Sequence, residues 1–153
     1  MKKLILTMLF AIAAMTAVLA REGNIDARVE KAFKNKFSSA TDITWKKFKT
    51  NYQVTFSNHH SVLNATYSEK GKLLEVRRNI SPLDLSGSLQ KSLKTHYDAH
   101  WVIDLVEITI GDVKAYYVTL EGPEDKIMMN SKAGSNWEVI TVMNKTGNYI
   151  INK

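Results

Sequence analysis

Apolar residues recur every three or four positions near the start of the chain, which is the spacing of one face of an amphipathic helix. The positions in this stretch are Ile25, Val29, Ala32, Phe33 and Phe37. A second stretch has leucine or tyrosine at every fourth position, namely Leu85, Leu89, Leu93 and Tyr97. We therefore predict two helices, and we expect Ser81 to cap the second one with Pro82 in its first turn.

Between and after these helices, apolar and polar residues alternate as they do in strands with one buried face. Tyr52, Val54 and Phe56 show this alternation most clearly. The predicted strands cover residues 43–49, 52–56, 63–67, 74–80, 102–110, 113–120, 126–130, 137–143 and 148–152. Short polar connections separate most of them, and hairpins of this kind imply antiparallel pairing.

The chain also resembles itself when it is shifted by 64 residues. Val29 then falls on Leu93, and residues 52–56 fall on residues 116–120. After a slip of one residue, Gly71 meets Gly134. These matches predict two tandem units, residues 21–80 and 81–153, which we expect to form one compact domain.

The predicted fold is α+β, with two tandem helix-plus-antiparallel-strand repeats. One helix in each repeat can cover one face of an antiparallel sheet, so both helices should pack on the same side. The opposite face of the sheet is then left free, and we expect a binding function to lie there.

The first twenty residues have the pattern of a cleavable bacterial signal peptide. Lys2 and Lys3 precede an uncharged apolar run, and Val18 and Ala20 supply small side chains before a cut at Arg21. The alternative is an uncleaved anchor, but the run is shorter than the roughly 20 residues that span a bilayer. We therefore expect a periplasmic or secreted protein with no membrane span after cleavage.

Composition narrows the chemistry of the exported part. The chain has no cysteine, which excludes disulfides, thiolate metal sites and a cysteine nucleophile. Residues 21–80 carry twelve basic and six acidic side chains, whereas residues 81–153 carry seven and nine. The basic first half could attract an acidic partner, although a solvated charged face explains the same composition.

The landmarks of the first unit resemble those of the PepSY-like periplasmic proteins, which share the β-lactamase-inhibitor-protein-like fold. The matching residues are Val29, Phe33, Phe37, Trp45, Tyr52, Val54, Phe56, Tyr67, Gly71, Leu74 and Pro82. The chain departs from the family at residues 68–71, where an Asp-x-Asp-Gly turn is common but only the glycine is kept. The resemblance implies a pair of helix–sheet repeats, export, and a binding or inhibitory role. No loop of the chain matches an inhibitor's contact loop, so inhibition of β-lactamase is not carried over.

No catalytic motif stands out, since the chain lacks a Gly-x-Ser-x-Gly elbow, a Ser-x-x-Lys motif and a glycine-rich phosphate loop. We therefore predict a protein that is not an enzyme and has no cofactor. His96 and His100 are four residues apart and could share a zinc ion with Asp104, but a structural zinc site generally needs four ligands. A thioether copper site could be formed by Met128, Met129 and Met143, but packing of Met128 or Met129 within a strand is the stronger explanation. We therefore predict no metal site.

Aromatic and basic residues of the strands are the remaining candidates for a binding site. Neighbours in a strand face opposite ways, so Tyr116 and Tyr117 cannot both point into the core. The predicted binding residues are Lys46, Lys47, Lys49, Tyr52, Tyr67, Arg77, Tyr117 and Trp137. The sequence thus predicts an exported module that binds an envelope or extracellular protein or peptide, and export argues against nucleic acid. The alternative is an envelope protein that binds a small ligand or a metal ion.

Overall fold

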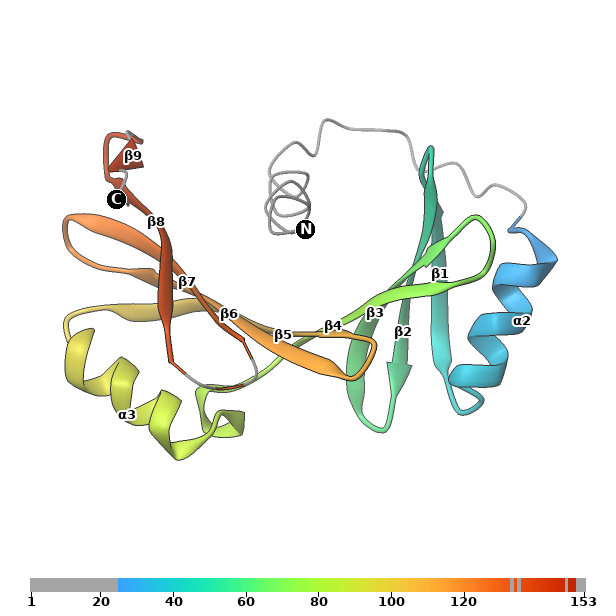
Figure 1. Cartoon of the computed structure of the whole chain (residues 1–153), viewed down its shortest axis with the longest axis horizontal. Helices are drawn as coiled ribbons and strands as arrows, with labels where there is room; N and C mark the ends of the chain where they lie inside the picture. The colour runs from blue at the N-terminus through green and yellow to red at the C-terminus, as the bar shows by residue number, and fades with distance from the viewer. Residues whose placement is uncertain (1–24, 133, 135, 148, 151–153) are drawn as a thin grey trace.

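A computed structural model describes residues 25–132, 134, 136–147 and 149–150. The signal peptide predicted at residues 1–20 lies outside these described residues, as does part of the strand predicted at 148–152. Figure 1 shows two helices on the outer side of a long, bent sheet. The α+β class predicted from the sequence is confirmed.

The first helix in the described part of the chain, α2 (Ala27–Lys36), forms where the first apolar stripe predicts it. The carboxylate of Asp26 caps it by accepting a hydrogen bond from the backbone N–H of Arg28 at 2.9 Å. Val29 and Phe33 are the buried residues of this helix, so the stripe faces the sheet. The helix ends at Lys36, and the backbone of Phe37 leaves helical geometry.

The second helix begins later than the sequence predicts. Ser81 and Pro82 open a short 3-10 turn, η1 (Pro82–Asp84), in which the Asp84 carboxylate accepts a hydrogen bond from the Ser81 N–H at 2.8 Å. The backbone then becomes extended at Leu85, so this turn cannot continue as a helix. The helix α3 (Gly87–His96) has its own cap in Ser86.

The sheet contains nine strands within the described ranges, in the same order as the chain. They are β1 (Thr41–Lys47), β2 (Asn51–Asn58), β3 (Ser61–Ser68), β4 (Leu73–Asn79), β5 (Trp101–Ile110), β6 (Val113–Glu121), β7 (Asp125–Lys132), β8 (Glu138–Asn144) and β9 (Tyr149–Ile150). Each strand pairs antiparallel with the next. The predicted strands before residue 148 all form, with ends that differ by a few residues.

Strand register places both helices on one face of the sheet. Directly paired residues point to the same face, and Val76 on β4 pairs with Thr109 on β5. Val76 packs against the core beneath α2. Leu105 lies on the same face as Thr109, four residues along β5, and belongs to the core beneath α3. The face predicted to carry the helices is therefore one continuous surface of β1–β8.

Two separate hydrophobic cores lie on this face, one under each helix. The first is aromatic, with the ring of Phe33 at centroid distances of 4.9 Å from Phe56 and 5.3 Å from Trp45. The second is mostly aliphatic and consists of Leu85, Leu89, Leu93, Leu105, Val118, Leu120, Ile127 and Met129. Each helix therefore stabilises a different half of the sheet.

The 64-residue offset is wrong for the helices. Val29 is the third residue of α2, and the third residue of α3 is Leu89, not Leu93. The buried pairs are Val29 with Phe33 in α2 and Leu89 with Leu93 in α3. A stripe with an apolar residue at every fourth position matches itself after a shift of one turn, so the sequence could not distinguish the two alignments.

Candidate binding surface

The face of the sheet turned away from α2 and α3, which we call the open face, is the candidate binding surface. Strand register identifies the residues of this face, because directly paired residues point to the same face. Arg77 pairs with Ile108, and Val106 pairs with Tyr117. These residues alternate with the core residues along each strand. Other residues on this face are Lys46, Gln53, Thr55, Asn64, Thr66, Glu75, Ala115, Thr119, Met128 and Asn130.

The part of the open face on β2–β4 is polar. Gln53 pairs with Thr66, and Thr55 pairs with Asn64, so hydroxyl and amide groups stand side by side. The Thr55 hydroxyl donates a hydrogen bond of 2.6 Å to the Asn64 side-chain oxygen. Arg77 adds a positive charge next to this group, because it pairs with Asn64. This region therefore presents donors and acceptors to a partner.

The part of the open face on β5 and β6 is apolar. Val106 and Ile108 expose only 5% and 6% of their surface, yet neither belongs to the cores under the helices. Ile110 and Val113, at the hairpin end of the same strands, are 53% and 59% exposed and pair with each other. The accessible apolar surface of this region therefore lies at the β5–β6 hairpin.

Three of the predicted binding residues lie on the open face. Lys46 reaches it from β1 because it pairs with Gln53, and Arg77 and Tyr117 reach it from β4 and β6. Tyr117 is partly buried, whereas Lys46 is exposed. The chain neighbours of Tyr117, Tyr116 and Val118, both contact the core under α3. Because neighbouring residues of a strand point to opposite faces, Tyr117 lies on the open face.

The remaining two lysines lie elsewhere. Lys47 pairs with Tyr52, so it stands on the helix-covered side, with its Nζ 5.5 Å from the centroid of the Tyr52 ring. Lys49 is an exposed residue of the bend between β1 and β2. The structure therefore separates these two lysines from Lys46.

Tyr52 and Tyr67 are core residues rather than binding residues, which corrects the sequence-based assignment. They expose 5% and 1% of their surface beneath α2. Burial raises the pKa of Tyr67 to about 12, so its hydroxyl stays protonated. Tyr52 alternates with the buried residues Val54 and Phe56, and that parity was the signal that could have placed it.

Trp137 also lies on the helix-covered side. Its indole Nε1 donates a hydrogen bond of 3.2 Å to the backbone oxygen of Leu89, and its ring packs against the core under α3. It therefore fixes α3 to the sheet and is not part of the open face. The sequence offers no signal for this contact, because the two residues are far apart in the chain.

The structure does not assemble a metal site from the proposed ligands. Among the residues that the structure describes, no three potential His, Asp or Glu ligands cluster together. His96 is exposed, whereas His100 Nε2 lies 2.9 Å from Asp125 Oδ1. Asp104 faces the other side of the sheet, opposite Thr119.

The methionines are similarly divided between the two faces. Met129 is fully buried under α3, whereas Met128 pairs with Thr141 on the open face. Met143 pairs with Lys126 at the far end of the same strands. Packing therefore accounts for Met129, and only Met128 and Met143 share a face.

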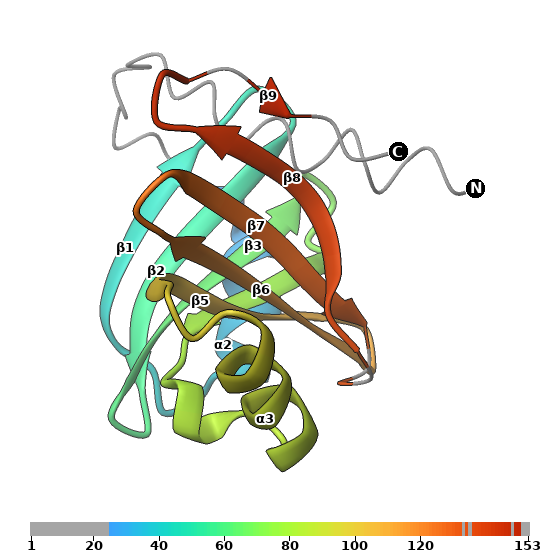
Figure 2. The same ribbon diagram turned by 90° about the vertical axis from the view of Figure 1, so that its left-hand side faces the viewer.

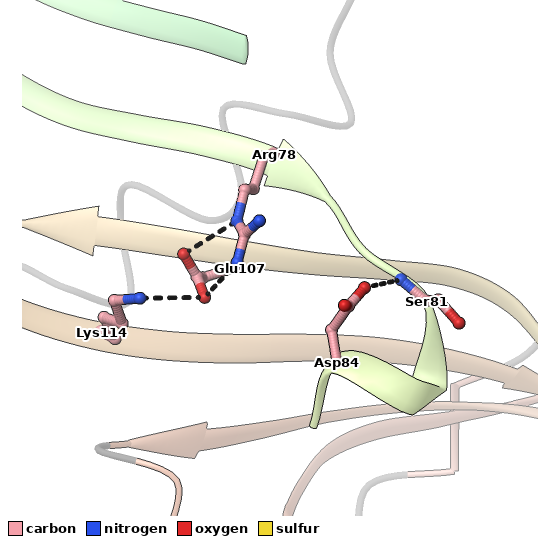
Figure 3. A network of polar contacts seen from close by, with 5 residues as sticks. All are labelled: Arg78, Ser81, Asp84, Glu107 and Lys114. Atoms are coloured by element: carbon pink, nitrogen blue, oxygen red, sulfur yellow. Dashed lines mark hydrogen bonds and ion pairs between the residues drawn. The ribbon is translucent and has the colours of Figure 1, made fainter. Parts of the chain in front are cut away.

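A network of charges lies between the two cores, on the helix-covered side (Figure 3). Glu107 contacts Arg78 at 3.1 Å and Lys114 at 3.4 Å. Burial alone would raise the pKa of Glu107, but the hydrogen bonds and charges of these two partners lower it below its ordinary value of 4.5. Glu107 therefore links β4, β5 and β6 through its ion pairs with Arg78 and Lys114.

In the part of the chain that the structure describes, neither helix is long and apolar enough to cross a membrane. Neither a family model nor a curated protein sequence matches the chain.

Solved structures of Bacteroides proteins share the fold. A BLIP-like protein from Bacteroides fragilis is 15% identical, with a TM-score of 0.68 over 82% of this chain and 90% of that chain. A DUF2874 family protein from Bacteroides uniformis is 13% identical, with a TM-score of 0.68 over 81% and 92%. A Bacteroides eggerthii structure named "putative periplasmic proteins" is 13% identical, with a TM-score of 0.67 over 80% and 90%. The chain therefore has the fold of a BLIP-like protein.

Proposed function

We propose that the chain is an exported, non-enzymatic binding module whose open face docks against a protein or a peptide. The observation that carries this proposal is the division of that face into a polar region on β2–β4 and an apolar region on β5 and β6. Such a mixture of hydrogen-bonding and apolar groups is typical of protein interfaces. The partner should therefore present acceptors and donors toward Thr55 and Arg77, and apolar side chains toward Ile110 and Val113.

The proposed place of action is the periplasm or the extracellular space. The predicted signal peptide supports it, and so does the word periplasmic in the name of the Bacteroides eggerthii protein of the same fold. The closer resemblance to PepSY-like proteins, and the origin of the chain as two tandem helix–sheet units, belong to the same proposal. In the described residues the first unit is a helix followed by four antiparallel strands and the second is a helix followed by five, and this shared order supports that origin.

The proposal can be tested by photo-crosslinking in the cell envelope. A photoreactive phenylalanine analogue replaces Thr55 or Asn130, which lie on opposite halves of the open face. The same analogue replaces Lys31 of α2 as a control, because that exposed residue lies on the helical side. We expect both open-face positions, but not position 31, to capture the same protein.

Substitutions then test the captured protein with purified components. Tyr117→Ala and Lys46→Glu should each weaken its binding at least fivefold, as measured by calorimetry. Lys31→Glu makes the same charge change on α2 and should leave binding unaltered. If equal crosslinks come from position 31, or if affinity is unchanged by every open-face substitution, the proposal is wrong.

A further inference from the structure

β5 is longer than the strand that pairs with it on one side. It pairs with β6 from Trp101 to Ile110, but with β4 only from Val106 to Thr109. One further hydrogen bond, from the Ile80 N–H to the Leu105 oxygen at 3.0 Å, ends this pairing. Within the described ranges, residues 101–104 therefore have a strand on the β6 side alone, and we call their other side the free edge.

A groove runs along this free edge. One part, of about 650 Å³, lies between α3 and β5 and is bordered by Leu93, Tyr97 and Leu120. A second part, of about 280 Å³, continues beside the end of β4. Both parts are bordered by Pro82 and Val102, so they adjoin each other. Figure 2 shows α3 below the strands, at the opposite end of the view from β8 and β9.

The walls of the groove are held in place by hydrogen bonds. The Gln90 side-chain amide of α3 donates to the backbone oxygens of Leu83 at 3.4 Å and Leu85 at 2.9 Å. The box formed by Ser81 and Asp84 fixes η1 from its other end (Figure 3). The groove is therefore formed without a ligand, which lowers the entropic cost of binding one.

Apolar side chains at the free edge are unusually exposed. Trp101 is 65% exposed, Val102 is 38% exposed and Ile103 is 48% exposed, and these residues follow one another in the chain. Leu83 of η1 stands at 82% exposure. Exposed edge strands usually carry charges or bulges that hinder further pairing. Residues 101–103 carry no charge, Asp104 follows them, and the register against β6 shifts between Val102 and Asp104. Backbone pairing and apolar contact are thus both available at one place.

The α3 side of the groove carries positive charge. Lys91 and Lys94 border it, and both are exposed. Asp98 borders the same part of the groove, and Asp104 borders the second part beside the end of β4. An occupant with a carboxylate on this side would be favoured over one with an amine.

We propose that the free edge of β5 binds an extended peptide segment of another protein as an added strand. Its backbone pairs with residues 101–104, one apolar side chain lies over Val102 and Leu120, and an acidic side chain faces Lys91 and Lys94. Strand addition of this kind takes its affinity from backbone hydrogen bonds and its selectivity from side-chain pockets. This site is separate from the open face and can exist whether or not the open face binds a partner.

The probe for this proposal is the peptide acetyl-Glu-Leu-Val-Leu-Glu-amide. Nuclear magnetic resonance of the protein should show saturable shifts of the backbone amides of residues 101–104. A matched peptide with N-methyl groups on the central residues keeps the side chains but cannot donate the backbone hydrogen bonds. It should bind at least tenfold more weakly. Equal binding of the two peptides, or no shifts at millimolar peptide, would overturn the proposal.

Protein variants provide the second arm. Lys91→Glu together with Lys94→Glu should weaken the peptide at least fivefold, whereas Lys31→Glu on α2 should not. Ile103→Pro should abolish binding by removing a backbone donor at the edge, and the lysine variants keep the test decisive if it does not fold. Tyr117→Ala should leave peptide binding unchanged, which separates this site from the open face. A dimer in light scattering that Ile103→Pro dissociates, with no peptide binding, would show that the edge pairs with a second copy instead.

Discussion

Arg78 on β4 and Glu107 on β5 form a two-point ion pair across the pairing that joins β1–β4 to β5–β9. The guanidinium Nε lies 3.1 Å from one carboxylate oxygen, and its second nitrogen lies 3.2 Å from the other. The carboxylate side chain is 8% exposed, whereas that of Arg78 is 37% exposed. The carboxylate of Glu107 is therefore buried, whereas the guanidinium side chain of Arg78 is partly in contact with solvent.

Arg78→Met should lower the free energy of unfolding by about 1–3 kcal/mol, because it leaves a buried carboxylate with Lys114 as its remaining partner. Urea denaturation followed by circular dichroism measures the change. The double variant Arg78→Met, Glu107→Gln should recover part of the loss, since the buried charge is then gone. Equal stability of wild type and Arg78→Met would contradict this role.

The stability of the fold should depend on Glu107 in acid. The pKa of Glu107 is lowered below 4.5 in the folded chain, so its ionised form stabilises the fold at higher pH. This contribution is lost as the pH falls through the folded-state pKa. Between about pH 5 and pH 3, wild type should therefore lose more stability than Glu107→Gln. Parallel pH curves for the two proteins would show that the carboxylate is not involved.

Phe33→Ala should remove the centre of the aromatic core under α2. The ring of Phe33 contacts those of Phe37, Trp45, Phe56 and Tyr67. Loss of a buried aromatic ring of this kind costs roughly 3–5 kcal/mol. Hydrogen exchange should accelerate more in β1–β4 than in β6 and β7, because the second core has no contact with this ring. Uniform acceleration across both halves would mean that the two cores unfold together.

Gly122→Ala should displace the pair formed by His100 and Asp125. An added Cβ would lie 2.6 Å from His100 Nε2 and 2.8 Å from Asp125 Oδ1, so one side chain must move. We expect a loss of roughly 1–2 kcal/mol in stability. The His100 ring resonances should also shift.

Gly87→Ala provides the matched control, because nothing lies within 4 Å of the added carbon at the start of α3. It should stabilise the protein by roughly 0.5 kcal/mol through reduced freedom of the unfolded chain. If both variants had the same stability, the close contact at Gly122 would have no energetic role.

Local pattern was enough to predict the strands and the two helical stripes. Apolar and polar residues alternate in β2 because one face of the strand is buried. Tyr52, Val54 and Phe56 lie on that buried face, under α2. The same rule, applied consistently, would have kept Tyr52 out of the binding site. The start of α3 was harder to predict, because Ser81 and Ser86 are both good caps and only the extended backbone at Leu85 separates them.

Contacts between distant residues could not be predicted from the sequence. The pairing of Arg78 with Glu107 depends on the register of β4 against β5, which are separated by η1 and α3. The hydrogen bond from Trp137 to Leu89 depends on how α3 lies on the sheet. The free edge of β5 arises from the difference in length between two paired strands, and a single strand pattern does not contain it.

The strictly sequential order of the strands has a consequence for how the chain folds. Most pairings close a loop of only a few residues, so little chain entropy is lost before each new strand gains its contacts. The sheet can therefore grow hairpin by hairpin within each half, a route that favours fast folding for a β-rich protein. The pairing of β4 with β5 must close the longest loop, because α3 lies inside it. Of the pairings in the described sheet, the one that joins its two halves therefore carries the largest loop-closure cost.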